Sequence, residues 1–168
     1  KGETLPEGYI RIPYHFVFDV KFDGRRKAHL VTGGHRTPDV SQKEVYSGIV
    51  SVDTIRVAFV LAELNNLGVM AADISIAFLN GRTREKVYIK AGPEFGEFAG
   101  KTLLIDGSVY GLKSSAARFH EHLAFRLRQL GFVPCRADYD LRMRPQGDHY
   151  EYIATYVDDL LVFSRDPS

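Results

Sequence analysis

Apolar positions along the chain change from a period of two to a helical period and back. Alternating apolar residues over 14–22 and 27–32, separated by Asp23-Gly24, predict a β-hairpin. Residues 52–67 then carry apolar side chains at helical spacing and are followed by Gly68 as a stop signal. Because this helix is apolar on most of its faces, we expect it to be buried against a sheet.

The second half of the pattern predicts more strands and one further helix. A strand is expected around Asp73, with short strands at 87–89 and 103–105. A second helix is predicted from residue 114 or 115 to residue 130, ended by Gly131. Two apolar runs, 152–157 and 160–163, close the chain. This order predicts an α+β fold in which helices pack behind an antiparallel sheet.

Two adjacent carboxylates, Asp158 and Asp159, lie between the last two apolar runs. We expect them at the tip of a β-hairpin, although Asp-Asp is a poor choice for a tight turn that needs positive φ. Two neighbouring like charges also repel each other, so the pair calls for a counter-charge such as a divalent metal ion. The alternative is a solvated acidic turn.

A third carboxylate, Asp73, interrupts the apolar segment 69–81. If this segment is buried, an ionised Asp within it is costly unless it is paired or bound to metal. Carboxylates from separate strands that hold two metal ions serve phosphoryl transfer, and Mg²⁺ suits such a site. The alternatives for Asp73 are a helix N-cap and a buried salt-bridge partner.

The chemistry-bearing motifs follow one another in a defined order. Asp73 is followed by Ala-Phe-Leu-Asn-Gly at 77–81, by Val-Tyr-Gly-Leu-Lys at 109–113 and by Tyr-Val-Asp-Asp at 156–159. In this order they closely resemble the reverse transcriptases of copia-type LTR retrotransposons. The similarity covers nearly the whole chain, from about residue 12 to residue 164.

The resemblance implies an RNA-directed DNA polymerase with a right-hand fold, of which fingers and palm are present. Residues 1–50 and 82–113 would form the fingers, and residues 51–81 and 114–168 the palm. The palm would be an antiparallel sheet backed by helices. A thumb and a ribonuclease H domain are expected downstream in the polyprotein, and the isolated fragment is expected to be weakly active or inactive.

The resemblance also assigns roles to individual residues. Asp73, Asp158 and Asp159 would be catalytic and would hold two Mg²⁺ ions, or Mn²⁺ in their place, with Ile74 as a further metal ligand. The residues implied in nucleotide binding are Lys21, Lys27, Phe78, Tyr110 and Gly111. The residues implied in nucleic-acid binding are Arg25, Arg26, His29, Lys113 and Tyr156. Without the resemblance, Phe78 would be interpreted as core and Gly111 as a helix-stop signal; with it, Phe78 is the steric gate against ribonucleotides.

Four positions depart from the family pattern. His29 replaces the usual Arg, Gly48 the usual Pro, and Ser114 and Ala116 the usual Gln and Pro. These departures keep open a second hypothesis, a domesticated, non-catalytic scaffold that binds nucleic acid or protein. Retention of all three carboxylates argues against it. A two-metal nuclease is a weaker third hypothesis, because it explains neither the basic hairpin nor Phe78.

Composition limits the compartment and the partners. Apolar residues make up 45% of the chain, with no stretch long enough to span a bilayer, and Cys135 is the only cysteine, which favours a reducing compartment. The formal net charge of +1 is small for a nucleic-acid binder, but basic residues cluster in the N-terminal third, up to Lys43.

The start, 1–4, is polar and lacks Met, as in an excised domain. Expected partners are an RNA or DNA template-primer, deoxynucleoside triphosphates and a second copy of the fragment, in cytoplasmic virus-like particles and without a membrane.

Overall fold

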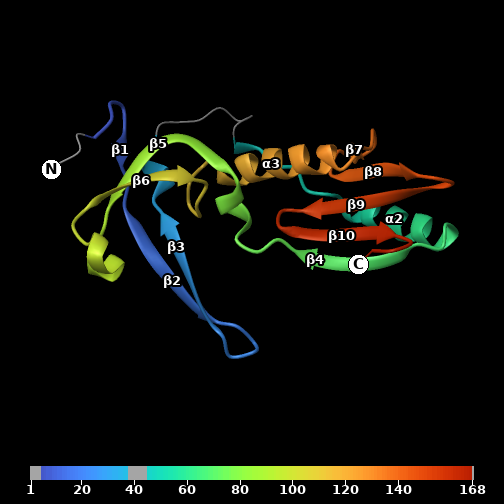
Figure 1. Cartoon of the computed structure of the whole chain (residues 1–168), viewed down its shortest axis with the longest axis horizontal. Helices are drawn as coiled ribbons and strands as arrows, with labels where there is room; N and C mark the ends of the chain where they lie inside the picture. Colours follow the sequence, from blue (N-terminus) through green and yellow to red (C-terminus); the bar gives the residue numbers. More distant parts are fainter. Residues whose placement is uncertain (1–4, 38–44, 168) are drawn as a thin grey trace. The chain divides into compact units, whose positions relative to one another are not determined.

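The computed structural model describes residues 5–37 and 45–167 (Figure 1). The chain forms two compact units, each built from two segments. Unit 1 comprises Lys1–Tyr46 and Phe78–Phe119, and unit 2 comprises Ser47–Ala77 and His120–Ser168. The assignment of these units as fingers and palm stays a prediction.

Unit 1 is built from a long hairpin and a small three-stranded sheet. Its elements are β1 (Ile10–Arg11), β2 (Tyr14–Val20), β3 (Arg26–Thr32), η1 (Gly34–Arg36), β5 (Arg82–Lys90), η3 (Pro93–Phe98) and β6 (Thr102–Gly107), with η2 (Ala77–Asn80) at its boundary. The predicted hairpin is confirmed: β2 and β3 pair antiparallel, and Gly24 adopts a φ of 81° in the connecting turn. β1 pairs parallel with β5, which pairs antiparallel with β6. The core of the small sheet is Ile12, Val87, Ile89 and Leu112.

Unit 2 is an antiparallel sheet with the order β4-β10-β9-β8-β7. The strands are β4 (Gly68–Asp73), β7 (Val133–Pro134), β8 (Leu141–Gln146), β9 (His149–Tyr156) and β10 (Asp159–Ser164). Helix α2 (Val52–Leu64) packs on one face, where Ala58 and Ala62 join Ala154 and Phe163 in a buried cluster. In Figure 1 this helix lies behind β9 and β10. The predicted antiparallel sheet with a packed helix is confirmed for this unit.

Helix α2 is three residues shorter than predicted. It ends at Leu64, because Asn66 takes a left-handed conformation with a φ of 53°. The amide of Leu67 then donates to the Ala62 carbonyl at 2.9 Å, which closes the helix end. Gly68, expected as the stop signal, is instead the first residue of β4.

Helix α3 (Ser115–Gln129) agrees with its predicted limits to within one residue. Gly131 adopts a φ of 88°, and the amide of Phe132 donates to the Leu127 carbonyl at 3.0 Å, which is the same type of helix end as that of α2. No helix within residues 5–37 or 45–167 is long and apolar enough to cross a membrane.

Candidate active site

The turn between β9 and β10 carries the adjacent carboxylates. β9 ends at Tyr156 and β10 begins at Asp159, so the two turn residues are Val157 and Asp158. The expectation that both carboxylates sit at the tip is wrong by one residue, because Asp159 already pairs with both neighbouring strands. Val157 adopts a φ of 55°, which strains a β-branched side chain. Such strain is concentrated at functional sites.

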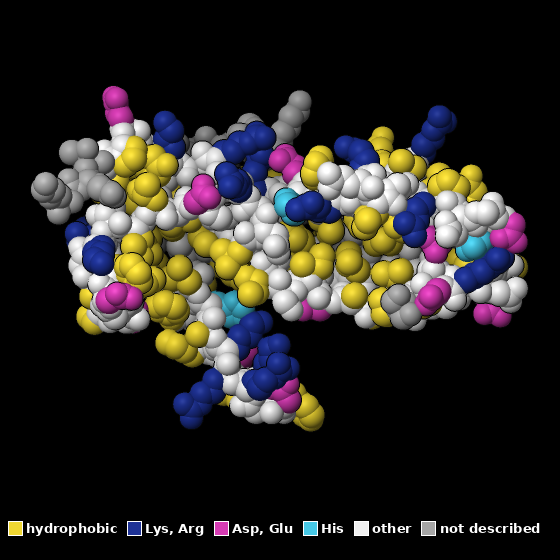
Figure 2. Space-filling view, in the orientation of Figure 1, with side chains coloured by type: hydrophobic (Ala, Val, Ile, Leu, Met, Phe, Trp, Pro, Cys, Tyr) yellow, Lys and Arg dark blue, Asp and Glu magenta, His cyan; other side chains and the backbone are white. Residues whose placement is uncertain are grey.

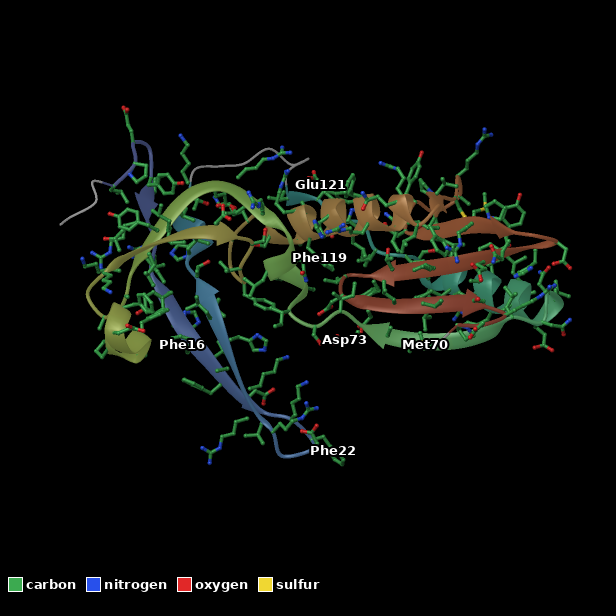
Figure 3. The ribbon with its side chains drawn as sticks, in the orientation of Figure 1. Phe16, Phe22, Met70, Asp73, Phe119 and Glu121 are labelled. Carbon is green, nitrogen blue, oxygen red and sulfur yellow. The ribbon has the colours of Figure 1, made fainter. Side chains whose placement is uncertain are left out.

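The third carboxylate lies directly across from the second. β4 runs antiparallel beside β10 with Asp73 opposite Asp159, and Figure 3 labels Asp73 at the end of β4. Side chains at directly opposed positions share one face of the sheet, about 5 Å apart at Cβ, and like charges there destabilise the strand pair. The Ile74 amide donates to the backbone carbonyl of Asp158 at 2.9 Å, which joins the turn to the end of β4. Three acidic residues therefore lie at one corner of the sheet, two of them directly opposite each other.

The expected burial of Asp73 is wrong. Asp73 and Asp159 are exposed and Asp158 is half-buried. β4 is an edge strand, and its residues Val69 and Ala71 are also exposed, so none of the helices within residues 5–37 and 45–167 covers this edge of the sheet. The need for a counter-charge therefore comes from the mutual repulsion of the carboxylates and not from their desolvation.

A hollow of about 440 Å³ lies beside the carboxylate pair. Asp73, Asp159 and Tyr156 line it together with Val50, Ile55 and apolar residues of β4, β9 and β10. Tyr156 is half exposed and is the Cα partner of Asp159. The hollow therefore leaves room beside both carboxylates for a cation and its waters.

The donor set fits Mg²⁺, although it does not form a closed cage. Among the described residues, no group of three or more His, Cys, Asp or Glu side chains is arranged to hold a metal ion. Mg²⁺ is usually bound by one or two carboxylates and keeps waters and substrate phosphates as its other ligands. The opposed pair Asp73 and Asp159, with Asp158 beside them, matches this open arrangement.

Four aromatic rings, named here the ring cluster, gather in unit 1: His29, Phe78, Tyr110 and Phe119. The Phe78 ring centroid lies 4.7 Å from that of Tyr110 and 6.2 Å from that of Phe119. The His29 ring packs edge-on against Tyr110 at 5.0 Å. Tyr110 remains 38% exposed, so one side of the ring cluster is accessible to a ligand.

Gly111 is explained by contacts within the chain. Its φ is 93°, and a Cβ there would lie 1.9 Å from the carbonyl oxygen of Thr32. The Thr32 amide donates to the Tyr110 carbonyl at 2.7 Å, so the two segments pack backbone to backbone. Thr32 therefore occupies the space that a side chain at position 111 would fill, and the expected contact of Gly111 with a nucleotide stays a prediction. Lys113 also has an internal partner, since its Nζ donates to the Thr37 carbonyl at 3.0 Å.

The basic residues of the hairpin divide between its two faces. The register pairs Val17 with His29 and Asp19 with Lys27, so Lys27 and His29 share one face, while Arg26 lies on the other. Arg25 forms an ion pair with Asp23 at 2.6 Å, and this contact lowers the pKa of Asp23. Lys21 is exposed in the turn. Figure 2 shows Lys and Arg side chains gathered at the outer end of the hairpin, where Figure 3 labels Phe22. Lys43 lies outside the described residues.

A buried polar cluster in unit 2 was missed from the sequence. Asp140 lies next to β8, and its Oδ1 is 2.5 Å from Nε2 of His120. The Thr155 amide donates to the Asp140 carbonyl at 2.9 Å, one residue before Tyr156. A Cβ on Gly48 would lie 2.1 Å from Oδ2 of Asp140, so Gly48 packs directly against this carboxylate. No local sequence signal could have joined residues so far apart.

The departure at Ser114 also serves packing. Its amide and its hydroxyl both donate to Oε1 of Glu85, at 3.1 and 2.7 Å. Ser114 is buried, so this pair fixes the segment that leads into α3.

Comparison with known proteins identifies the family of the chain. A family model described as reverse transcriptase (RNA-dependent DNA polymerase) matches residues 3–168. The Transposon Ty1-LR2 Gag-Pol polyprotein of Saccharomyces cerevisiae is 31% identical over 153 residues, which cover 90% of this chain and 8% of that protein. The truncated transposon Ty1-A Gag-Pol polyprotein of the same yeast is also 31% identical over 153 residues, which cover 12% of its length. No solved structure matches the chain.

The chain thus spans about a tenth of the length of these relatives, and nearly all of it matches them. The motif order, the opposed carboxylates and these comparisons agree. The chain belongs to the reverse transcriptase family, as a domain of the copia type found in retrotransposon polyproteins.

Proposed function

We propose that this chain carries the catalytic centre of an RNA-directed DNA polymerase that extends a primer on an RNA or DNA template. The observation that carries the proposal is the pairing of Asp73 with Asp159 across two strands, beside Asp158 in a strained turn. Carboxylates placed opposite each other repel and destabilise the metal-free protein, and a bound cation would neutralise this repulsion. Family membership supports the same reaction.

The three carboxylates would hold two Mg²⁺ ions, or Mn²⁺ in their place, and the backbone of Ile74 would supply a further oxygen ligand. When bound, the ions favour ionisation of the primer 3′-hydroxyl and neutralise charge that develops on the α-phosphate. The chain contributes fixed positions: the strand pair fixes Asp73 and Asp159, and the Ile74–Asp158 backbone bond fixes the turn. Positioning of this kind needs no protein nucleophile.

The ring cluster would bind the incoming nucleotide. Contacts with Tyr110 and Phe119 hold Phe78 in place, so its ring resists displacement by a ribose 2′-hydroxyl. Lys21 and Lys27 would contact the triphosphate, since both are exposed on the hairpin that also bears His29. Gly111 would act indirectly, because its contact with Thr32 sets the position of Tyr110.

Five residues are proposed to contact the template-primer. The proposed contacts are Arg25, Arg26, His29, Lys113 and Tyr156. Exposed Arg and Lys side chains provide sequence-independent affinity for phosphates. Further partners would be the thumb and ribonuclease H regions of the polyprotein, within cytoplasmic virus-like particles.

Two experiments test the proposal in steps. Paramagnetic broadening by Mn²⁺ in NMR spectra of this chain should affect resonances of Asp73, Asp158 and Asp159 first. Primer extension on poly(rA) should then require these carboxylates in a form that includes the neighbouring polyprotein segments. The isolated chain should extend weakly or not at all, because few phosphate contacts hold the duplex.

The same experiments separate the alternatives. A domesticated scaffold would bind nucleic acid without selective Mn²⁺ broadening at the carboxylates. A nuclease would degrade the primer in Mg²⁺ without extending it. Extension that survives Asp73→Asn in a folded protein would overturn the polymerase assignment.

A further inference from the structure

Thr155, next to the end of β9, bonds to three residues through its backbone and its hydroxyl. β9 lies between β8 and β10 in the sheet (Figure 1). The Thr155 amide donates to the Asp140 carbonyl at 2.9 Å, and the Thr155 carbonyl accepts from the Val50 amide at 3.0 Å. The hydroxyl donates to the same Asp140 carbonyl at 3.2 Å and accepts from Nη1 of Arg142 at 3.2 Å. Thr155 is 2% exposed, so water has little access to these bonds.

The groups that hold Thr155 include a buried charged pair. The side chains of Asp140 and Arg142 are 8% and 5% exposed, and Nη1 of Arg142 lies 3.7 Å from Oδ1 of Asp140. Burial of a charged pair costs desolvation energy, and apolar side chains of similar volume often stabilise a fold as well or better. Apolar side chains could not form the hydrogen bonds to Thr155, so these bonds give the charged pair a role beyond packing.

The turn that follows Thr155 needs to be held in place. Val157 has a φ of 55°, a conformation that is strained for a β-branched residue and that persists only where the surrounding structure fixes it. On the β4 side, the Ile74 amide donates to the Asp158 carbonyl at 2.9 Å. On the β9 side, Thr155 lies two residues before Val157. The strained turn is therefore fixed from β4 by Ile74 and from β9 by Thr155.

We propose that Thr155 is a positioning residue, which fixes the β9 end of the strained turn and thereby the places of Asp158 and Asp159. This inference rests on the proposed function, in which these carboxylates hold the metal ions. Tyr156 provides the connection, because it follows Thr155 in β9 and is the Cα partner of Asp159. Without the Thr155 contacts the turn relaxes, and the carboxylates bind a cation less tightly.

Two substitutions disturb these contacts from different parts of the chain. Thr155→Val replaces the hydroxyl by a methyl group and removes the bond from Nη1 of Arg142. Gly48→Ala leaves β9 unchanged, but its Cβ would lie 2.1 Å from Oδ2 of Asp140, so that carboxylate has to move. Thr155→Ser keeps the hydroxyl and is the conservative variant that should behave like the parent chain.

Ser164→Ala is the matched control. It removes another buried hydroxyl from the same sheet, one that donates to Oε1 of Glu151 at 2.5 Å. Ser164 lies five residues from Asp159 along β10, which corresponds to about 17 Å. Ser164→Ala should therefore lower the Tm of the chain, as Thr155→Val does, without moving the carboxylates. Circular dichroism confirms that each variant is folded.

Amide hydrogen exchange of Ile74 in the metal-free protein tests whether Thr155 holds the turn, because the Ile74 amide bonds to Asp158. The exchange rate of this amide should rise about fivefold or more in Thr155→Val and in Gly48→Ala. It should stay within about twofold of the parent rate in Thr155→Ser and in Ser164→Ala, since local opening does not follow global stability. Unchanged exchange in the first two variants would overturn the proposal.

The Kd of Mn²⁺, measured by EPR of the free ion, tests the effect on the carboxylates. At a temperature where every variant is fully folded, a lower Tm alone leaves this Kd unchanged. The Kd should rise about fivefold or more in Thr155→Val and in Gly48→Ala, but not in Ser164→Ala. Faster Ile74 exchange with an unchanged Kd would overturn the positioning role. A parent chain that binds no Mn²⁺ would instead overturn the proposed function, and with it the purpose of the fixed turn.

Discussion

Replacing Asp159 by Asn should stabilise the protein without divalent ions and destabilise it, relative to the parent chain, when Mg²⁺ is added. In the parent chain Asp159 lies directly across from Asp73. Cross-strand pairs change stability by about 0.2–1 kcal/mol, and the exposed positions of both residues keep the repulsion within this range. For a protein of this length, the gain corresponds to a rise in Tm of roughly 1–4 °C.

Added Mg²⁺ should make the parent chain more stable than the variant, because Mg²⁺ binds the folded parent chain better than the folded variant. At a concentration tenfold above its Kd, a ligand stabilises the folded state by about 1.4 kcal/mol. This exceeds the repulsion that Asp159→Asn removes. Thermal unfolding of both proteins at low ionic strength, first in EDTA and then with increasing Mg²⁺, should therefore give two Tm curves that cross.

Two controls test whether the crossing of the Tm curves is specific to the pair Asp73 and Asp159. Asp106→Asn applies the same change to an exposed strand residue of unit 1 and should shift Tm equally with and without Mg²⁺. Adding Asp73→Asn to Asp159→Asn should give no further gain in EDTA, because the repulsion is already absent. A lower Tm for Asp159→Asn in EDTA, or equal Mg²⁺ shifts for both proteins, would refute the reasoning.

Three further predictions follow from individual contacts. Phe78→Val should raise the ratio of ribonucleotide to deoxynucleotide kcat/KM by about tenfold or more in a polymerase-competent form, with Phe78→Tyr as the control that keeps the ring. Gly111→Ala should destabilise unit 1 by at least about 2 kcal/mol in urea unfolding, because its Cβ would meet the Thr32 carbonyl at a positive φ. Arg165, which donates to Asp148, lowers the pKa of that carboxyl to about 2. The stabilisation is present above pH 4 and is lost as the pH falls toward 2, so the unfolding midpoints of the parent chain and of Asp148→Asn should converge over that interval.

The secondary structure could be predicted because its signals are local. Alternation over β2 and β3, helical spacing over α2 and α3, and a Gly at a positive φ at position 131 each act within a few residues. The errors occur where a segment distant in the sequence determines the local structure. Pairing with β4 extends β10 to Asp159 and moves the turn, and the edge position of β4 leaves Asp73 exposed. Neither the strand order nor the absence of a covering helix is encoded within those segments.

The same distinction between local signals and distant contacts applies to the candidate site. The motifs single out the three carboxylates, whose role stays a prediction, and the placement of Asp73 opposite Asp159 follows from the β4–β10 register. The Asp140 cluster could not be predicted, because Gly48, His120 and Thr155 meet only after unit 2 has folded. The apolar α2 helix was predicted to be buried, and only its inner side is, because sequence cannot show which side of a helix the sheet covers.

The motifs therefore contain residues of two kinds, and the structure separates them. Gly111 and Ser114 contact other parts of the same unit, so substituting them tests folding before it tests chemistry. Asp73, Asp159 and Lys27 are exposed and contribute little to the packing around them. Substitutions at these three positions should therefore test their proposed roles in the reaction without loss of the fold. Phe78 belongs to both kinds, since the ring contacts that pack it are also those that would hold it against the sugar.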